Sequence, residues 1–225
     1  MKERGMIFNG EMTRAILDGR KTQTRRIMKV QPSEDFTPMN MALETDYKAR
    51  WYTPGVVDKD GYLQPASKKV FGVSNENEGY SCPFGAVGDR IWVRETWARY
   101  NIDQNSHDIA YRATTPADWP EEGRWRPSIH MPRWASRILL EITNVRVERL
   151  NAISEEDAEV EGIDMEALYD SQDCYDCIAD HNMTGRPTVT GAFKYLWESI
   201  YGEEGWKSNP WVWVIEFKRI EGGAA

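Results

Sequence analysis

The sequence contains little cysteine, no long apolar run and no excess of basic residues. Its three cysteines are Cys82, Cys174 and Cys177, and this odd, low number gives no disulfide framework. No apolar run is long enough to cross a bilayer, and the N-terminus has no apolar segment of the signal-peptide type. We therefore expect a cytoplasmic protein that has no membrane partner.

The balance of charge excludes one class of function. The chain has 36 Asp and Glu against 28 Lys and Arg, so its formal net charge is −8. Proteins that coat nucleic acid without regard to sequence are usually basic. A histone-like coat protein is therefore excluded, whereas a local basic pocket in an acidic body is not.

The length and composition are those of a globular protein. The chain has 225 residues, of which 40% are hydrophobic and 28% are charged. This length suits one large domain with a substantial core, so we expect residues 1–225 to form a single domain. Ten tryptophans are many for such a chain, and some of them are candidates for stacking surfaces.

The pattern along the chain is mainly that of strands. Strands are expected at residues 6–8, 21–28, 108–114, 138–150 and 210–220, and another from about residue 90; helices are expected at 9–19, 154–162 and 190–202. Two polar segments, 28–80 and 163–190, read as long insertions. Because strands and helices do not alternate regularly, we expect an α+β fold, a mixed β-barrel with flanking helices.

A basic segment with interleaved hydroxyls follows the first expected helix. Residues 16–26 read ILDGRKTQTRR, with Gly19 placed as the helix stop. A lysine beside a hydroxyl acts as a base when burial or neighbouring cations lower its pKa, which points to Lys21 and Thr24. In a regular strand these two positions face opposite sides, so they meet only if Lys21 lies in the turn after Gly19. The alternative is a solvated basic strand.

An acidic segment lies further along the chain. Residues 155–180 contain eleven Asp or Glu and no Lys or Arg, and most of these are expected on a solvated face. Glu161 is different, because it lies near the C-terminal end of an expected helix, where the helix dipole disfavours a carboxylate. This position suggests that Glu161 has a tertiary partner in the Lys21 segment.

Two segments mix arginines with aromatic residues. One contains Arg94, Glu95 and Trp97, and the other contains His130 and Arg133. Cations beside flat rings suit a free base or a single-stranded nucleic acid, and Glu95 is able to accept a hydrogen bond from a base amino group. The alternative is a tryptophan core coated by arginines.

The cysteines also suggest a metal site. Cys174 and Cys177 form a CxxC pair, His181 follows four residues later, and Cys82 lies far upstream. Four such ligands can hold zinc. A single CxxC in an expected insertion is a weak pattern, so we expect no metal and keep this zinc site as the lesser alternative.

The segment ILDGRKTQTRR resembles the signature of the ASCH superfamily, whose fold is a PUA-like β-barrel. LNAISEEDAEVEG at 150–162 and WVWVIEFKRI at 211–220 resemble further segments of that superfamily, in the same order. The longer arrangement, with CPFGAVGDRIWVRETW and HMPRWASRI, is similar to ASCH proteins of phages and prophages. The resemblance implies a PUA-like fold and a bacterium, or the bacterial host of a phage, as the source.

The resemblance to small bacterial ASCH proteins that hydrolyse N4-acetylcytidine implies an activity. Their lysine, threonine and glutamate match Lys21, Thr24 and Glu161. It implies that neutral Lys21 deprotonates Thr24 or a water, that Glu161 assists, and that no cofactor is needed. The residues expected to bind the substrate are Thr22, Arg26, Arg94, Glu95, Trp97, His130 and Arg133. We expect an amidohydrolase for N4-acylated cytosine nucleosides or a related modified base.

Two other functions stay open. One is a module that binds RNA, or another single-stranded nucleic acid, with or without ribonuclease activity; RNA is favoured over DNA. The other is binding of a host protein through the insertions. The chain is about twice as long as the small amidohydrolases, and the segments 28–80 and 163–190 have no counterpart in them.

Overall fold

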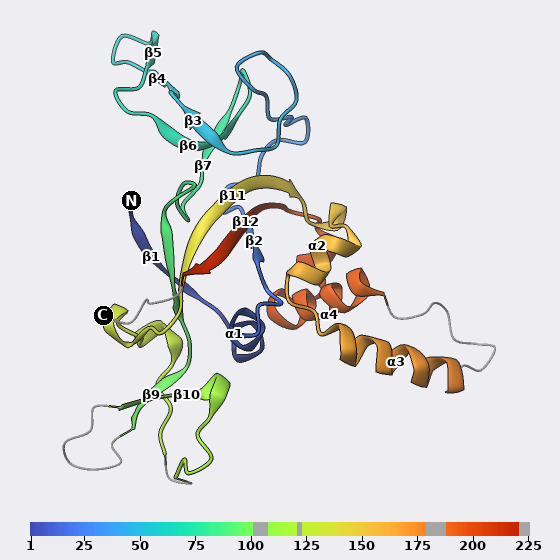
Figure 1. The fold of residues 1–225 in the computed structure, drawn as a ribbon. Coiled ribbons are helices and arrows are strands. Elements are labelled where there is room, and N and C mark those ends of the chain that lie inside the picture. Colours follow the sequence, from blue (N-terminus) through green and yellow to red (C-terminus); the bar gives the residue numbers. More distant parts are fainter. Residues whose placement is uncertain (101–107, 121–122, 179–187, 221–225) are drawn as a thin grey trace.

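The structure is a computed structural model that describes residues 1–100, 108–120, 123–178 and 188–220 (Figure 1); for residue 100 and residues 172–178 it describes the backbone alone. The chain has a mixed α+β fold that consists mainly of β-sheet. The expected α+β class is therefore confirmed. No helix of the described ranges has the length and apolar character needed to cross a membrane.

The main sheet has five strands. They are β1 (Glu3–Ile7), β8 (Arg90–Arg94), β11 (Leu139–Arg149), β12 (Trp211–Ile220) and β2 (Gln23–Ile27), and they lie in that order across the sheet. β1 and β8 are parallel, and the other pairs are antiparallel. β11 and β12 form the longest ladder, with a register shift between Ile142 and Asn144. A strand was expected near each of these positions.

β12 is apolar on both faces because it separates two cores. Trp213 and Ile215 belong to a cluster on one face of the sheet, whereas Val212 and Val214 belong to a second cluster formed with α2 and α4. Successive side chains of a strand point to opposite faces, so burial on both sides requires an unbroken apolar run. This requirement explains the sequence WVWVI at residues 211–215.

The two edge strands of the main sheet, β1 and β2, approach each other without forming a ladder. Arg26 of β2 donates a hydrogen bond from Nη2 to the carbonyl of Ile7 at 2.8 Å, and its guanidinium lies 5.2 Å from the centre of the Phe8 ring. A closed barrel needs a continuous ladder around its circumference. No such closure is found among the described residues, so the expected barrel is not confirmed.

The first insertion forms small sheets that share the main core. β3 (Arg50–Tyr52), β6 (Val70–Ser74) and β7 (Gly79–Ser81) make a three-stranded sheet, and β4 (Gly55–Val57) pairs with β5 (Leu63–Pro65) at the top of Figure 1. Phe36, Phe71 and Val73 pack in the same hydrophobic cluster as the main sheet. A separate hairpin of β9 (Trp97–Tyr100) and β10 (Asp108–Tyr111) lies at the other end of the molecule.

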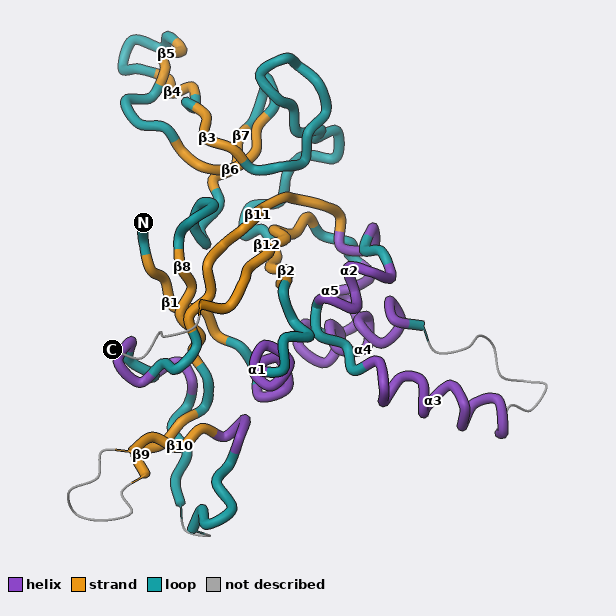
Figure 2. The backbone as a smooth tube through the Cα atoms, viewed as in Figure 1, coloured by secondary structure: helices purple, strands orange, loops and turns teal. Residues whose placement is uncertain are grey.

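The helices gather on one side of the main sheet (Figure 2). They are α1 (Gly10–Leu17), α2 (Glu155–Val160), α3 (Met165–Ile178), α4 (Val189–Tyr201) and α5 (Glu203–Lys207). Single 3₁₀ turns occur at η1 (Arg112–Thr114), η2 (Ser128–His130), η3 (Arg133–Ala135) and η4 (Leu150–Ala152). α3 occupies much of the second expected insertion.

The ends of α1 and α2 follow the capping residues in the sequence. Asn9 accepts a hydrogen bond from the amide of Met12, and Ser154 accepts one from the amide of Asp157 at 3.1 Å. Gly19 and Gly162 follow the two helices with φ of +79° and +99°, values that favour glycine. α1 therefore ends four residues before Lys21, and α2 ends directly before Glu161.

Gly72 provides a test of how the insertion is coupled to the core. A Cβ at this position would lie 1.9 Å from the carbonyl oxygen of Tyr80. Gly72→Ala should therefore force β6 and β7 apart and lower the free energy of unfolding by about 1–3 kcal/mol. Because Phe71 and Val73 belong to the main core, we expect one shifted transition in urea unfolding.

Gly10→Ala is the matched control, because a Cβ at Gly10 would meet only Arg14, at an ordinary 3.6 Å. Its stability should stay within about 0.5 kcal/mol of the parent protein. A separate early transition in Gly72→Ala, with the main transition unchanged, would show that the insertion unfolds independently.

Candidate functional site

Lys21 lies in the turn between α1 and β2. Its backbone amide donates to the carbonyl of Ala15 at 2.9 Å, and β2 begins only at Gln23. The side chain is buried, with 2% of the residue exposed. The strand geometry that would separate Lys21 from Thr24 therefore does not apply, and the solvated basic strand is not what the structure contains.

The Lys21 ammonium group is held by Glu161. Its Nζ lies 2.6 Å from the Glu161 carboxylate oxygen Oε2 and 2.6 Å from the Glu161 carbonyl oxygen. The carbonyl belongs to the C-terminal end of α2, where the helix dipole favours a cation. The tertiary partner that the position of Glu161 suggested is therefore Lys21.

Gly162 allows this close approach. A Cβ at residue 162 would lie 2.9 Å from the Cβ atoms of both Lys21 and Ala15. The positive φ of Gly162 also disfavours any side chain. Glycine is thus needed here both for the conformation and for the contact with Lys21.

Glu161 is shared between Lys21 and Arg25. Its second oxygen, Oε1, accepts from Arg25 Nη1 at 3.0 Å. Arg25 is fully buried and also donates to Asp157 at 2.8 Å and, from Nε, to Glu148 at 2.7 Å. The Glu161 carboxylate therefore has both oxygens fixed, which holds its position.

The network continues across the same face of the sheet to β11 and β12. Arg146 of β11 donates to Asp157 at 2.6 Å and also pairs with Glu216 of β12. It further donates to the side-chain oxygen of Gln23 at 3.2 Å. One connected set of charges therefore joins β2, β11, β12 and α2.

Burial lowers the pKa of Lys21 below its usual value. Glu161 opposes this effect, because its charge favours the ammonium form, and Arg26 and Arg25 lower the pKa further. Burial alone would lower the pKa of Arg25 too, but Glu161, Glu148 and Asp157 outweigh it and raise that pKa. Of these two cations, Lys21 is therefore the one whose neutral form is favoured relative to its usual value.

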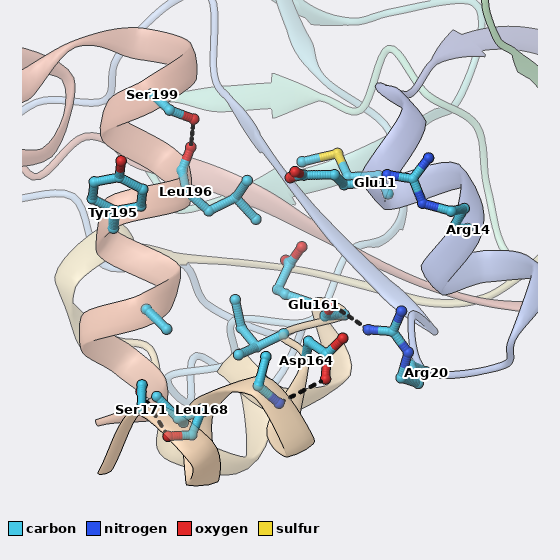
Figure 3. Close-up of a pocket in the computed structure, with 15 residues that line it drawn as sticks. Glu11, Arg14, Arg20, Glu161, Asp164, Leu168, Ser171, Tyr195, Leu196 and Ser199 are labelled. Atoms are coloured by element: carbon cyan, nitrogen blue, oxygen red, sulfur yellow. Dashed lines mark hydrogen bonds between the residues drawn. The ribbon is translucent and has the colours of Figure 1, made fainter. Parts of the chain in front are cut away.

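A cleft of about 840 Å³ opens beside Glu161 (Figure 3). Arg14 and Arg20 lie on one wall, and Tyr195 and Leu196 of α4 lie on the facing wall, with Glu161 between them. Arg20 is fixed by a hydrogen bond to the carbonyl of Gly162 at 3.1 Å. The cleft is large enough for a nucleoside-sized molecule, since small-molecule sites commonly span about 300–1,000 Å³.

Thr24 lies in a smaller pocket that adjoins the cleft. This pocket, of about 20 Å³, is also lined by Glu161 and Arg26, and it shares Met12, Glu161 and Leu196 with the cleft. The Thr24 hydroxyl has no hydrogen-bond partner within the described ranges. The pocket has room for about one water molecule, since a water needs roughly 10–15 Å³ measured in this way.

Thr22 and Arg26, two of the expected substrate-binding residues, lie near this site in different ways. Arg26 lines the Thr24 pocket, and its Nε is buried without a hydrogen-bond partner among the described residues. Thr22 is exposed and lines a separate pocket with Gln23, Asp157 and Glu216. The structure therefore brings Arg26, and not Thr22, together with Thr24 and Glu161.

The other five lie at the end of β8 and in the lobe around β9 and β10. Glu95 is buried and forms a two-point ion pair with Arg137, at 2.9 and 3.0 Å. Trp97 is buried in a small core with Met131 and Ala135. Arg94 bonds to the carbonyl of Ile129, Arg133 pairs with Glu3 at 2.9 Å, and His130 is exposed. None of the five lines the cleft or the Thr24 pocket.

The expected zinc alternative falls mostly outside the described residues. This is so for His181 and for the side chains of Cys174 and Cys177, whose backbone lies in α3. Burial raises the pKa of the Cys82 thiol to about 11. In the part of the chain that the structure describes, no group of three or more His, Cys, Asp or Glu is placed to hold a metal ion.

Several residues of the site were not singled out from the sequence. They are Arg14, Arg146, Glu148, Asp157 and Tyr195. A signal existed for Asp157, which lies four residues before Glu161 and therefore on the same side of the helix. Nothing local pointed to Arg146, because its partners come from three separate segments.

A comparison of the chain with protein-family models, with curated proteins and with solved structures finds no match.

The lowered pKa of Lys21 predicts how stability depends on pH. Between the folded-state pKa and the usual value of 10.5, the unfolded chain binds more protons than the folded protein. The free energy of unfolding should therefore rise with pH in this interval relative to that of Lys21→Met, which lacks the group. Urea unfolding of both proteins at a series of pH values measures the difference. If the difference in free energy of unfolding between the two proteins fell as the pH rose, the charge of Glu161 would outweigh burial and the pKa of Lys21 would be raised.

Proposed function

We propose that the protein is an ASCH-type hydrolase that removes the acyl group from an N4-acylated cytosine nucleoside or a related modified nucleobase in the cytoplasm. The observation that carries the proposal is the buried Lys21–Glu161 pair, whose carboxylate lines both the cleft and the Thr24 pocket. Burial lowers the pKa of Lys21, which makes this lysine better suited to act as a base than an exposed lysine. The superfamily and the acylated cytosine come from the sequence resemblance.

The arrangement suggests a sequence of proton transfers. Neutral Lys21 takes a proton from a water, held by the Thr24 hydroxyl, or from Thr24 itself. The oxygen attacks the acyl carbonyl, whose electron pair moves onto the carbonyl oxygen. That pair returns as the C–N bond breaks, and the proton on Lys21 passes to the leaving amine. With water as nucleophile the products are a carboxylic acid and the cytosine nucleoside; with Thr24, a water then hydrolyses the acyl-threonine ester.

Two features favour these steps. Arg26 lines the pocket, and its Nε is buried and lacks a partner in the described ranges, so Arg26 is suited to donate to the developing oxyanion. Once Lys21 is protonated, Glu161 stabilises the ammonium from 2.6 Å. Thr24, Arg26 and Glu161 therefore supply the hydroxyl, the oxyanion donor and the counter-charge.

The relation to a PUA-like barrel is also a proposal. Its support is the five-stranded sheet whose edge strands are bridged by Arg26 and Ile7. In this view the insertions of a phage or prophage ASCH protein surround an incomplete barrel.

Binding of single-stranded nucleic acid is the second candidate. Its support is a set of arginines over tryptophan rings: Arg94 over Trp92 at 5.4 Å and Arg99 over Trp134 at 5.7 Å. Trp134 is 58% exposed, so its ring is open to a base. Steep salt dependence of binding would favour this candidate over turnover of a small molecule.

Lys21→Met tests the hydrolase. With N4-acetylcytidine as the substrate, the parent protein should release cytidine, and the variant should be slower by about 10²- to 10⁴-fold, the usual contribution of a general base. Arg25 continues to pair with Glu161 in the variant, and a circular-dichroism spectrum like that of the parent protein shows that the variant is folded. Chromatography of the products measures the rate.

The matched control is Lys207→Met, an exposed lysine of α5 that pairs with Glu203 and Glu204. It should hydrolyse the substrate at the parent rate. Equal rates for Lys21→Met and Lys207→Met would remove Lys21 from the reaction. If the folded parent protein releases no cytidine, nucleic-acid binding becomes the favoured function.

Arg26→Gln tests whether Lys21 is the group whose titration controls the rate. The positive charge of Arg26 lowers the pKa of Lys21, so removing that charge should raise this pKa. The rise of kcat/KM with pH, which reports neutral Lys21, should then move to higher pH, and kcat should fall because an oxyanion donor is lost. Lys207→Met should leave the midpoint unchanged. A lower kcat without a shift would show that a group other than Lys21 titrates.

A further inference from the structure

A second pocket, of about 400 Å³, lies where the first insertion meets the main sheet. Its lining comes from the start of β1, from β3 and β6, and from the loop before β8. The residues that matter for its chemistry are Lys2, Arg4, Trp51, Lys69, Cys82 and Asp89. It shares no lining residue with the cleft beside Glu161.

This pocket is positive in a protein whose net charge is −8. Lys2, Arg4 and Lys69 line it, against the single carboxylate of Asp89. That carboxylate is already engaged, by the backbone amide of Lys2 at 2.7 Å and by Arg4 at 3.3 Å. The ammonium groups of Lys2 and Lys69 have no ion-pair partner within the described ranges. The pocket therefore attracts anions.

Trp51 adds a flat surface beside these cations. It projects from β3 with 57% of its surface exposed and touches Phe71 in an edge contact, with the ring centres 5.7 Å apart. Of the tryptophans in the described ranges, only Trp51 and Trp134 are more than half exposed. An aromatic face next to cations recognises a ring that carries a negative group.

The pocket has the features of a binding site rather than of a second catalytic site. The Cys82 thiol has a pKa raised to about 11 by burial, so it stays protonated at neutral pH. Asp89 is held by its hydrogen bonds, and no histidine lines the pocket. Among the lining residues, neither a base nor an activated nucleophile is present.

We propose that this pocket binds a nucleotide, with its phosphate held by Lys2, Arg4 and Lys69 and its base stacked on Trp51. The pocket lies in the size range of small-molecule sites, about 300–1,000 Å³. The ligand is either a free nucleotide or one unit of a single strand, since both present the same phosphate and ring. The proposal does not depend on hydrolysis at Lys21.

Calorimetric titration of the full chain with cytidine 5′-monophosphate, and separately with a short single-stranded oligocytidylate, tests the proposal. Lys69→Ala and Trp51→Ala should each weaken binding by about tenfold, in line with one charge-assisted contact or one base stack. Inorganic phosphate should compete, and the affinity should fall as salt is added. Binding of the mononucleotide would identify a free nucleotide, and binding of the oligomer alone would identify a strand; either result supports the pocket.

Two matched controls lie outside the pocket. Lys68→Ala removes the neighbouring exposed lysine, and Tyr62→Ala removes an exposed aromatic residue of the same insertion. Both should bind like the parent protein. The proposal is wrong if the folded parent binds neither probe, if Tyr62→Ala weakens binding and Trp51→Ala does not, or if inorganic phosphate binds as tightly as the nucleotide. Because the readout is binding, failure of the hydrolase assay does not affect it.

Discussion

The contact on which the rest of the site depends is the Glu161 carboxylate between Lys21 and Arg25. All three side chains are almost completely buried. Removal of one partner from such a cluster costs about 3–5 kcal/mol, because the remaining charge is left buried and uncompensated. The end of α1, the start of β2 and the end of α2 therefore have to meet at one place. Gly19 and Gly162 allow the chain to make the two turns that this meeting requires.

The same contact links the site to the main sheet. Arg25 joins Glu161 to Glu148 on β11, and Arg146 joins β11 to Asp157 on α2 and to Glu216 on β12. Each of these charges is satisfied only when the strands are in their observed register. The position of Glu161 at the cleft is thus set by the sheet and not by a loop. In the proposed reaction, a site held in this way would have little reorganisation to undergo when charge develops on the substrate.

Local features of this site are readable from the sequence, and its long-range features are not. Asn9, Gly19, Ser154 and Gly162 mark the ends of α1 and α2, and the unfavourable position of Glu161 in its helix correctly indicated a tertiary partner. No pattern showed that β12 would lie between β11 and β2, or that Arg146 would join the network.

Glu95 illustrates the limit of prediction from local sequence. Beside Arg94 and Trp97 it was expected to bind a substrate, whereas its partner is Arg137, 42 residues away, in a separate buried cluster. Pairings of this kind depend on which segments fold together.

Burial favours the neutral form of Lys21, whereas the carboxylates around it favour the protonated form. This balance matters for the proposed base. Without Lys21, the network contains four carboxylates, Glu148, Asp157, Glu161 and Glu216, and two guanidiniums, Arg25 and Arg146. This excess of negative charge favours the protonated lysine, whereas the absence of solvent favours the neutral one. A base has to be neutral before the reaction and stable as a cation during it. A fully buried lysine in an apolar site would meet only the first requirement, and an exposed lysine paired with a glutamate would meet only the second. The proposed role of Lys21 as a base depends on the balance between its burial and this carboxylate-rich network.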